Sequence, residues 1–203
     1  VVAMGASGGR LEADADRIGL RGACVAAFEP ASADRGSAAT LRYFADAQDL
    51  AAWTPPDHSA RVRLTEYVAG LPASILSLVA GDTVHSFDPI EIVALTLPAE
   101  HRFVFCGTST LWRPSDALRK TMREPARLIG MAMAHADGYE GEFSVDGIVE
   151  DDRFFVTEVN ARHASGLGLR AAWPEFPIEL LSRSIAEPGS VPNSVPLEAV
   201  VAA

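Results

Sequence analysis

The stretch GEFSVDGIVEDDRFFVTEVNARHASG, residues 141 to 166, decides how the rest of the chain is interpreted. Two apolar runs flank the acidic triplet at 150 to 152, which is typical of a β-hairpin. Alternate positions of the second run change from apolar to polar: Phe154, Val156, Glu158, Asn160 and Arg162. A regular strand would carry all five on one face. Such a strand either ends at a ligand site or simply runs out of the core into solvent.

The register of this hairpin decides between the two readings. With a three-residue loop at 150 to 152, Asp146 lies opposite Val156, on the face that carries Glu158 and Asn160. A two-residue loop would send Asp146 to the other face. In the first register two carboxylates and one amide oxygen converge, and oxygen ligands are what Mg²⁺ prefers. Arg162 lies just beyond and could stabilise charge on a transferring phosphoryl group. For Asp146 alone, a turn-proximal aspartate before a glycine is the alternative.

Composition excludes several classes of protein. The 203 residues are 48% hydrophobic and 22% charged, which fits one compact domain or two small lobes. The net charge of -10 has no basic cluster within it, so a nucleic-acid binder is disfavoured. No apolar stretch has the length of a membrane span. Cys24 and Cys106 match neither a metal-ligand spacing nor a disulfide framework, and both are expected to be buried thiols of a cytoplasmic protein.

Turn and breaker residues divide the chain into three parts. Residues 1–60 read as helix, strand, loop, strand and helix, and the adjacent prolines Pro55 and Pro56 mark the boundary. Residues 61–187 follow with strand candidates at 61–68, 72–80, 83–95 and 102–110, a helix over about 115–136, and the hairpin. Residues 188–203 are Pro-rich and are expected to be peripheral.

The hairpin resembles the C-terminal signature of the ATP-grasp ligases, in which an acidic residue on one strand and E-x-N, often E-x-N-x-R, on the next bind the Mg²⁺ of MgATP. The resemblance implies an α+β fold of two lobes with antiparallel sheets and a nucleotide cleft between them. Carried over by position, it makes Asp146, Glu158 and Asn160 the metal ligands. It makes Arg162 the catalytic arginine that faces phosphate and acyl phosphate.

Two further segments extend the resemblance over residues 13 to 182. RLTEYVAG, residues 63 to 70, is similar to the family's hinge, whose main chain recognises adenine, and this implies nucleotide contacts at Glu66, Tyr67 and Val68. The segment from Asp16 to Trp53 resembles the small lobe with its glycine-rich loop, and the loop between Phe28 and Gly36 is expected to be mobile without nucleotide.

The chain departs from the family pattern in the small lobe. Ala26, Ala27 and Phe28 stand near the usual place of a phosphate-binding lysine, and the ribose-binding acid after the hinge is missing. Either arginines such as Arg35 and Arg42 bind the phosphates, or ATP binding is weakened, or part of the lobe lies outside this chain.

The resemblance implies an ATP-dependent ligase that joins a carboxylate to an amine through an acyl phosphate, with ATP and Mg²⁺ as cofactors. It looks closest to bacterial natural-product peptide ligases of the pheganomycin type, whose substrates are amino acids or peptides. The sequence leaves self-association into a homo-oligomer open. The alternative is a degenerate ATP-grasp module that binds a nucleotide or a partner without catalysis.

Overall fold

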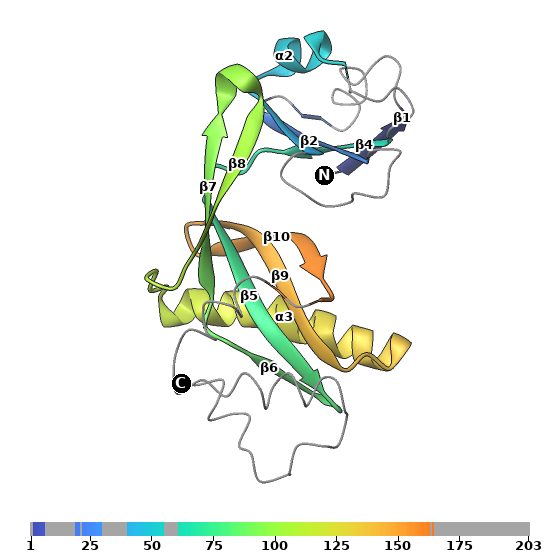
Figure 1. Cartoon of the computed structure of the whole chain (residues 1–203), viewed down its shortest axis with the longest axis vertical. Coiled ribbons are helices and arrows are strands. Elements are labelled where there is room, and N and C mark those ends of the chain that lie inside the picture. Colours follow the sequence, from blue (N-terminus) through green and yellow to red (C-terminus); the bar gives the residue numbers. More distant parts are fainter. Residues whose placement is uncertain are drawn as a thin grey trace. The chain divides into compact units, whose positions relative to one another are not determined.

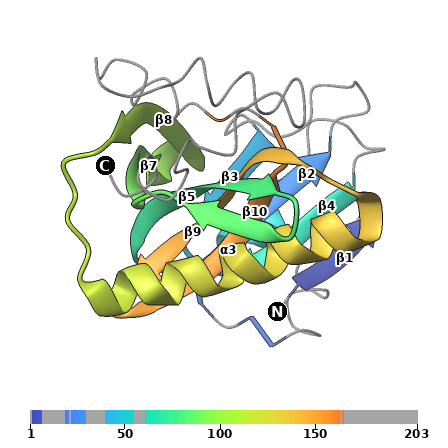
Figure 2. The same ribbon diagram turned by 90° about the horizontal axis from the view of Figure 1, so that it is seen from below.

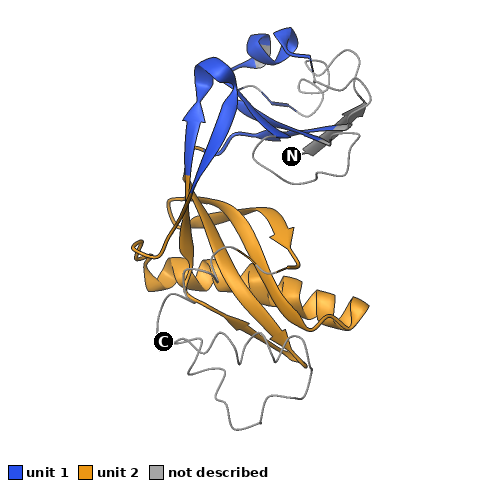
Figure 3. Cartoon of the chain, viewed as in Figure 1, with its two compact units in different colours: residues 1–68, 94–106 blue, residues 69–93, 107–203 orange. Residues whose placement is uncertain are grey.

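A computed structural model of the chain describes residues 2–6, 19–20, 22–29, 40–54, 61–162 and 164. These residues belong to two compact units (Figure 3). Unit 1 comprises residues 1–68 and 94–106, and unit 2 comprises residues 69–93 and 107–203. Every strand pairing with a known register is antiparallel, and the described helices are few, so the chain is of the α+β class (Figure 1). No helix within these ranges is long and apolar enough to cross a membrane.

Unit 1 is built on the strand order β1-β4-β2-β3, with β8 (Arg102–Ser109) next to β3. The first four strands are β1 (Val2–Ala6), β2 (Cys24–Glu29), β3 (Leu41–Phe44) and β4 (Arg61–Glu66). Helix α2 (Ala47–Ala52) begins after Asp46, whose carboxylate accepts hydrogen bonds from the amides of Gln48 and Asp49. A short 3₁₀ helix, η2 (Pro98–Glu100), precedes β8. The strands and helix predicted for 23 to 53 are therefore confirmed.

The core of unit 1 lies on one face of its sheet, against α2. Its buried side chains are Leu20, Cys24, Ala26, Phe28, Phe44, Leu50, Val62 and Leu64. Trp53 packs against this cluster, with its ring centroid 5.2 Å from that of Phe44. Burial raises the pKa of the Cys24 thiol to about 11, so this cysteine is an inert core residue, as the sequence predicted. Cys106 is exposed, and the prediction that it is buried is wrong, because it lies on a strand whose face is open at that point.

Unit 2 is a sheet in the order β7-β5-β9-β10, with β6 paired to β5. Its strands are β5 (Leu71–Ala80), β6 (Thr83–Ser86), the first half of β7 (Ile90–Leu97), β9 (Gly141–Glu150) and β10 (Arg153–Asn160). From residue 94 on, β7 belongs to unit 1. Gly81, with φ of 55°, turns the chain from β5 to β6, between the strands predicted for 72–80 and 83–95. The single strand predicted for 83 to 95 is two strands, because Phe87, Asp88 and Pro89 interrupt it.

Helix α3 (Asp116–Asp137) lies against one face of this sheet (Figure 2). Ser115 caps its first turn by accepting a hydrogen bond from the amide of Leu118, and Gly138 ends it with φ of 61°. Pro125 is accommodated inside the helix. Leu128 is 55% exposed, because it lies off the buried row formed by Leu118, Met122 and Ala126.

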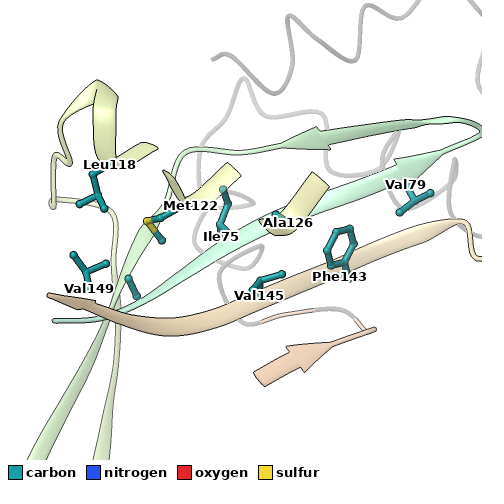
Figure 4. Close-up of a cluster of buried hydrophobic side chains, with 9 residues drawn as sticks. Ile75, Val79, Leu118, Met122, Ala126, Phe143, Val145 and Val149 are labelled. Carbon is teal, nitrogen blue, oxygen red and sulfur yellow. The ribbon is translucent and has the colours of Figure 1, made fainter. Parts of the chain in front are cut away.

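The core of unit 2 fills the space between α3 and the sheet (Figure 4). Its buried members are Ala73, Ile75, Val79, Leu118, Met122, Ala126, Phe143, Val145 and Val149. Trp112 and Phe154 pack against its edge. Gly130 brings the helix close to the sheet, since a Cβ there would lie 2.8 Å from the Val84 side chain and 2.9 Å from the Phe143 ring.

The division between the units differs from the boundary expected at residue 60. The units divide between Val68 and Ala69, and residues 94–106 return to unit 1. The reason is that β4 pairs with both β1 and β2, which holds residues 61–66 in unit 1. The double proline, most of the loop between Phe28 and Gly36, and residues 188–203 lie outside the described residues.

Candidate functional site

The β9–β10 hairpin closes with a two-residue turn at Asp151 and Asp152. Arg153 pairs with Glu150, and Asp151 adopts a φ of 53°. Of the two loop lengths that the sequence left open, the two-residue loop is therefore the one present. The left-handed conformation of Asp151 permits the tighter turn, and an ion pair between Arg153 and Glu150 bridges its ends.

A β-bulge between Val156 and Glu158 then shifts the register by one residue. Before the bulge, Val156 pairs with Gly147, and after it Glu158 pairs with Asp146. Phe154 and Val156 thus share the face of the α3 core, whereas Glu158 and Asn160 lie on the opposite face. The expectation that all these alternate positions share one face is wrong, because the additional residue, Thr157, interrupts the alternation.

The bulge nevertheless brings the polar residues together. Asp146 lies directly across from Glu158, and Asn160 Nδ2 donates a hydrogen bond to Asp146 Oδ2 at 3.0 Å. Arg162 donates to Asn160 Oδ1 at 3.2 Å. The predicted convergence of Asp146, Glu158 and Asn160 on one face is therefore present, but it arises from a tight turn and a bulge rather than from a longer loop.

The four polar residues of this cluster differ in how far they are exposed to solvent. Asp146 and Asn160 are half-buried, while Glu158 and Arg162 are exposed. The half-buried carboxylate is held at both oxygens, because Ser74 Oγ on β5 donates to Asp146 Oδ1 at 2.6 Å. The main-chain carbonyl of Asp146 also accepts from Thr157 Oγ1 at 3.2 Å, across the bulge. Asp146 is therefore the fixed member of the cluster, and Glu158 is the one open to solvent.

The donor set fits magnesium. Two carboxylates and an amide oxygen are hard ligands, and Mg²⁺ is commonly held by one or two carboxylates together with water and phosphate oxygens. Within the described ranges, no three Asp, Glu, His or Cys side chains gather as a fuller metal cage. The cluster thus suits a cation that arrives with a phosphate-bearing ligand better than a permanently bound structural metal. Asn160 Oδ1, now accepting from Arg162, is the amide atom that would face the cation.

The segment Glu66 to Val68 lies at the end of β4 in unit 1. The Tyr67 amide donates to the Ala23 carbonyl at 2.9 Å, which continues the β2–β4 pairing beyond Cys24 and Glu66. Because main-chain groups alternate in direction along an antiparallel strand, the Glu66 carbonyl at the end of β4 points away from β2. The Tyr67 ring meets Tyr43 edge to face at 4.9 Å. The Glu66 carbonyl is therefore an acceptor on the side of the chain away from β2.

Arg42 lies on the core face of the unit 1 sheet. It pairs with Ala26 on β2 and with Arg102 on β8, and its guanidinium lies 5.2 Å from the centroid of the Phe28 ring. Its Nη1 donates to the Leu41 carbonyl at 2.7 Å. Burial and, secondarily, the charge of Arg102 lower its pKa. These contacts are structural, and a role of Arg42 in phosphate binding stays a prediction. Arg35 lies outside the described residues.

Sequence reasoning missed Ser74. The run PASILSLVA reads as an apolar strand, and a serine within it carries no sign of its partner. Only the β5–β9 register, which pairs Ser74 with Asp146, brings its hydroxyl to the carboxylate. A usable signal was that Ser74 stands among apolar residues, where an isolated buried hydroxyl needs a hydrogen-bond partner.

No protein-family model matches the chain, and no curated protein matches its sequence. Solved structures do match. An L-amino acid ligase from Bacillus licheniformis is similar over 92% of this chain and 45% of its own, with a TM-score of 0.64 and 14% identity. The ADP complex of PurK, an N5-carboxyaminoimidazole ribonucleotide synthetase, is similar over 82% of this chain and 41% of its own (TM-score 0.61, 14% identity).

A third similar structure is the D-alanine-D-alanine ligase from Coxiella burnetii. It is matched over 79% of this chain and 42% of its own, with a TM-score of 0.54 and 16% identity. Identities this low show the fold alone, and the chain has the ATP-grasp fold that its sequence predicted. The chain spans less than half the length of each of these three proteins.

Proposed function

We propose that this chain is part of an ATP-dependent ligase that joins a carboxylate to an amine by way of an acyl phosphate. The observation that carries the proposal is the polar row formed by Asp146, Glu158 and Asn160 on one face of the β9–β10 hairpin. The similar structures support it, because they include an L-amino acid ligase and a D-alanine-D-alanine ligase.

In the proposed reaction, a carboxylate oxygen of the substrate attacks the γ-phosphorus of ATP, and the bond to the bridging oxygen breaks to release ADP. The amine of the second substrate then attacks the acyl carbon. Phosphate leaves with the electron pair of the cleaved C–O bond, and the amine loses a proton to solvent. Phosphoryl transfer of this kind depends mainly on positioning and charge stabilisation, and needs no nucleophile from the protein.

The proposed roles of the residues follow from their chemistry. Asp146, Glu158 and Asn160 would hold Mg²⁺, which when bound neutralises the charge of the nucleotide phosphates. Arg162 would move from Asn160 to the transferring phosphoryl group, where its planar donors match phosphate oxygens. The outward carbonyl of Glu66 and the amide of Val68 would bind the edge of adenine, beside the Tyr67 ring.

The proposal also includes the substrates. Amino acids or short peptides are proposed as the carboxylate and amine partners, consistent with a cytoplasmic enzyme of a natural-product pathway. A second candidate, a module that binds nucleotide without catalysis, is favoured by one observation. No lysine stands on β2, and Arg42, which lies across from it, is engaged in the unit 1 core. The polar row of unit 2 favours the enzyme.

The test is release of ADP and phosphate by the full-length protein, given ATP and a panel of amino acids and short peptides at several magnesium concentrations. The proposal expects release that requires Mg²⁺ and one pair of substrates. Calorimetric titration with ATP in the same buffers separates the two candidates. Binding of ATP with no release for any substrate pair would favour the non-catalytic module, and absence of both would overturn the two candidates together.

A further inference from the structure

Ser74 contacts the polar row of Asp146, Glu158 and Asn160 from a neighbouring strand. It lies on β5, pairs with Asp146 on β9, and its hydroxyl donates to Asp146 Oδ1 at 2.6 Å. Only 5% of Ser74 is exposed, so the hydroxyl has little access to water as an alternative partner. Ser74, Asp146 and Glu158 therefore form a row across three adjacent strands on one face of the sheet.

The two hydrogen bonds to the Asp146 carboxylate are anchored differently. Asn160 ends β10, the outermost strand of the sheet, and it is itself a proposed ligand that must turn its amide oxygen to a cation. Ser74 lies on β5, which pairs with β6, β7 and β9. A donor on a central strand keeps its place when the edge strand adjusts. Ser74 can thus hold one oxygen of Asp146 while the other exchanges Asn160 for a ligand.

We infer that Ser74 is a positioning residue for the proposed ligase: its hydroxyl fixes the Asp146 carboxylate in the orientation that leaves Oδ2 for the cation. The inference rests on the proposed function. Groups that orient a metal ligand typically affect metal affinity by about 10- to 100-fold when they are removed. Loss of the hydroxyl should therefore weaken metal binding much more than it weakens the fold.

The same strand provides a matched control. Ser77 is also fully buried, and its hydroxyl forms a hydrogen bond of 2.8 Å with Ser86 Oγ on β6. It contacts no carboxylate among the described residues. Ser74→Ala and Ser77→Ala each remove one buried hydroxyl from β5, so their effects on folding should be similar, and only the first removes a contact to Asp146.

The experiment compares wild type, Ser74→Ala, Ser74→Thr and Ser77→Ala in the full-length protein. Mn²⁺ is titrated in the presence of ADP and followed by electron paramagnetic resonance, and thermal unfolding is measured on the same samples. The magnesium concentration that gives half-maximal ADP release is a second readout. Ser74→Ala should weaken Mn²⁺ binding by about tenfold or more. Ser77→Ala should leave it within about twofold, and Ser74→Thr, which keeps a hydroxyl, should restore most of the affinity.

Equal Mn²⁺ affinity in Ser74→Ala and Ser77→Ala, with wild type binding normally, would overturn the role of Ser74 and leave the proposed function standing. Failure of wild type to bind Mn²⁺ with ADP would overturn both. If Ser74→Ala does not fold, Ser74→Cys replaces it, because a thiol has a similar shape but donates weakly. Its affinity must then fall in the same direction, and an unchanged value would overturn the inference.

Discussion

The two faces of the sheet in unit 2 are formed by the same strands but differ in role: one packs against α3, and the other carries the polar row. On one face Phe143 and Val145 are fully buried beneath α3. Ser144 and Asp146, which alternate with them along β9, lie on the other face together with Ser74 and Glu158. Side chains that alternate along a strand can serve two environments at once. In β9, alternate residues therefore serve different roles: one set stabilises the fold, and the other belongs to the proposed site.

The edge strand β10 separates its apolar and polar side chains differently from the central strands. β5 and β9 alternate regularly, whereas β10 contains a bulge that separates its core-facing half from its polar half. Phe154 packs against the α3 core, and Glu158 lies on the other face, although regular alternation would place both on one side. A bulge that redirects a side chain beside a site is a known use of this irregularity.

Glu158→Gln tests the polar face and should have the largest effect. The amide keeps the size of the side chain but removes the charge that a cation needs, so ADP release should fall by orders of magnitude and require more Mg²⁺. Thermal unfolding should change little, because Glu158 is exposed. The control is Glu150→Gln in the same hairpin. This substitution removes only the surface ion pair between Glu150 and Arg153, which is worth up to about 1 kcal/mol. Equal loss of turnover in both variants would contradict the assignment.

Phe143→Ala tests the apolar face. Removing a fully buried ring should lower the free energy of unfolding by about 3–5 kcal/mol, because the transfer free energy is lost and a cavity remains. Urea unfolding followed by circular dichroism measures the change. Leu128→Ala on α3, where the side chain is 55% exposed, is the control and should change the free energy of unfolding by less than about 0.5 kcal/mol. The folded fraction of Phe143→Ala should keep the magnesium dependence of wild type, and a shifted dependence would show that the faces are coupled.

Gly147→Ala is the variant most able to break the separation of the faces. A Cβ at this position would lie 2.4 Å from the Phe155 carbonyl and 2.5 Å from the Phe154 ring. The hairpin must shift beside the bulge, at an expected cost of about 1–3 kcal/mol, and the half-saturating magnesium concentration should rise too. Gly22→Ala, where a Cβ meets nothing within 4 Å, is the control for glycine replacement. Stability like that of the control would mean that β9 and β10 are not packed in this register.

Ser115→Ala should have the smallest effect and sharpen the comparison from the helix side. It removes the cap of α3, in which Ser115 Oγ accepts from the Leu118 amide at 3.2 Å, at a cost of about 1 kcal/mol. Ser115→Asp keeps a capping oxygen and should unfold at the same urea concentration as wild type. Neither variant should change Mn²⁺ binding, and a change in either would show that the helix influences the polar face.

The sequence was a good guide wherever one residue type determines the local structure. The strand expected at 72–80 and the helix expected over about 115–136 lie within a residue or two of those bounds, and the E-x-N pattern singled out Glu158 and Asn160, which lie next to Asp146. The sequence was a poor guide where the pairing between strands determines which residues come into contact. Thr157 is an ordinary strand residue, so nothing in its identity announces a bulge. The contact of Ser74 with Asp146 depends on the register of two strands about seventy residues apart, and the unit boundary depends on β4 joining β2.

The placement of the aromatic residues provides an optical means to follow each unit by itself. The chain has three tryptophans, and the two described ones are Trp53 in the core of unit 1 and Trp112 beside the core of unit 2. Variants that keep one indole and replace the others by phenylalanine would emit from a single known position. Fluorescence of the Trp53 protein would then report the melting of unit 1, and that of the Trp112 protein the melting of unit 2. Coincident curves would mean that the two units melt as one cooperative domain, and separate curves would give each its own transition.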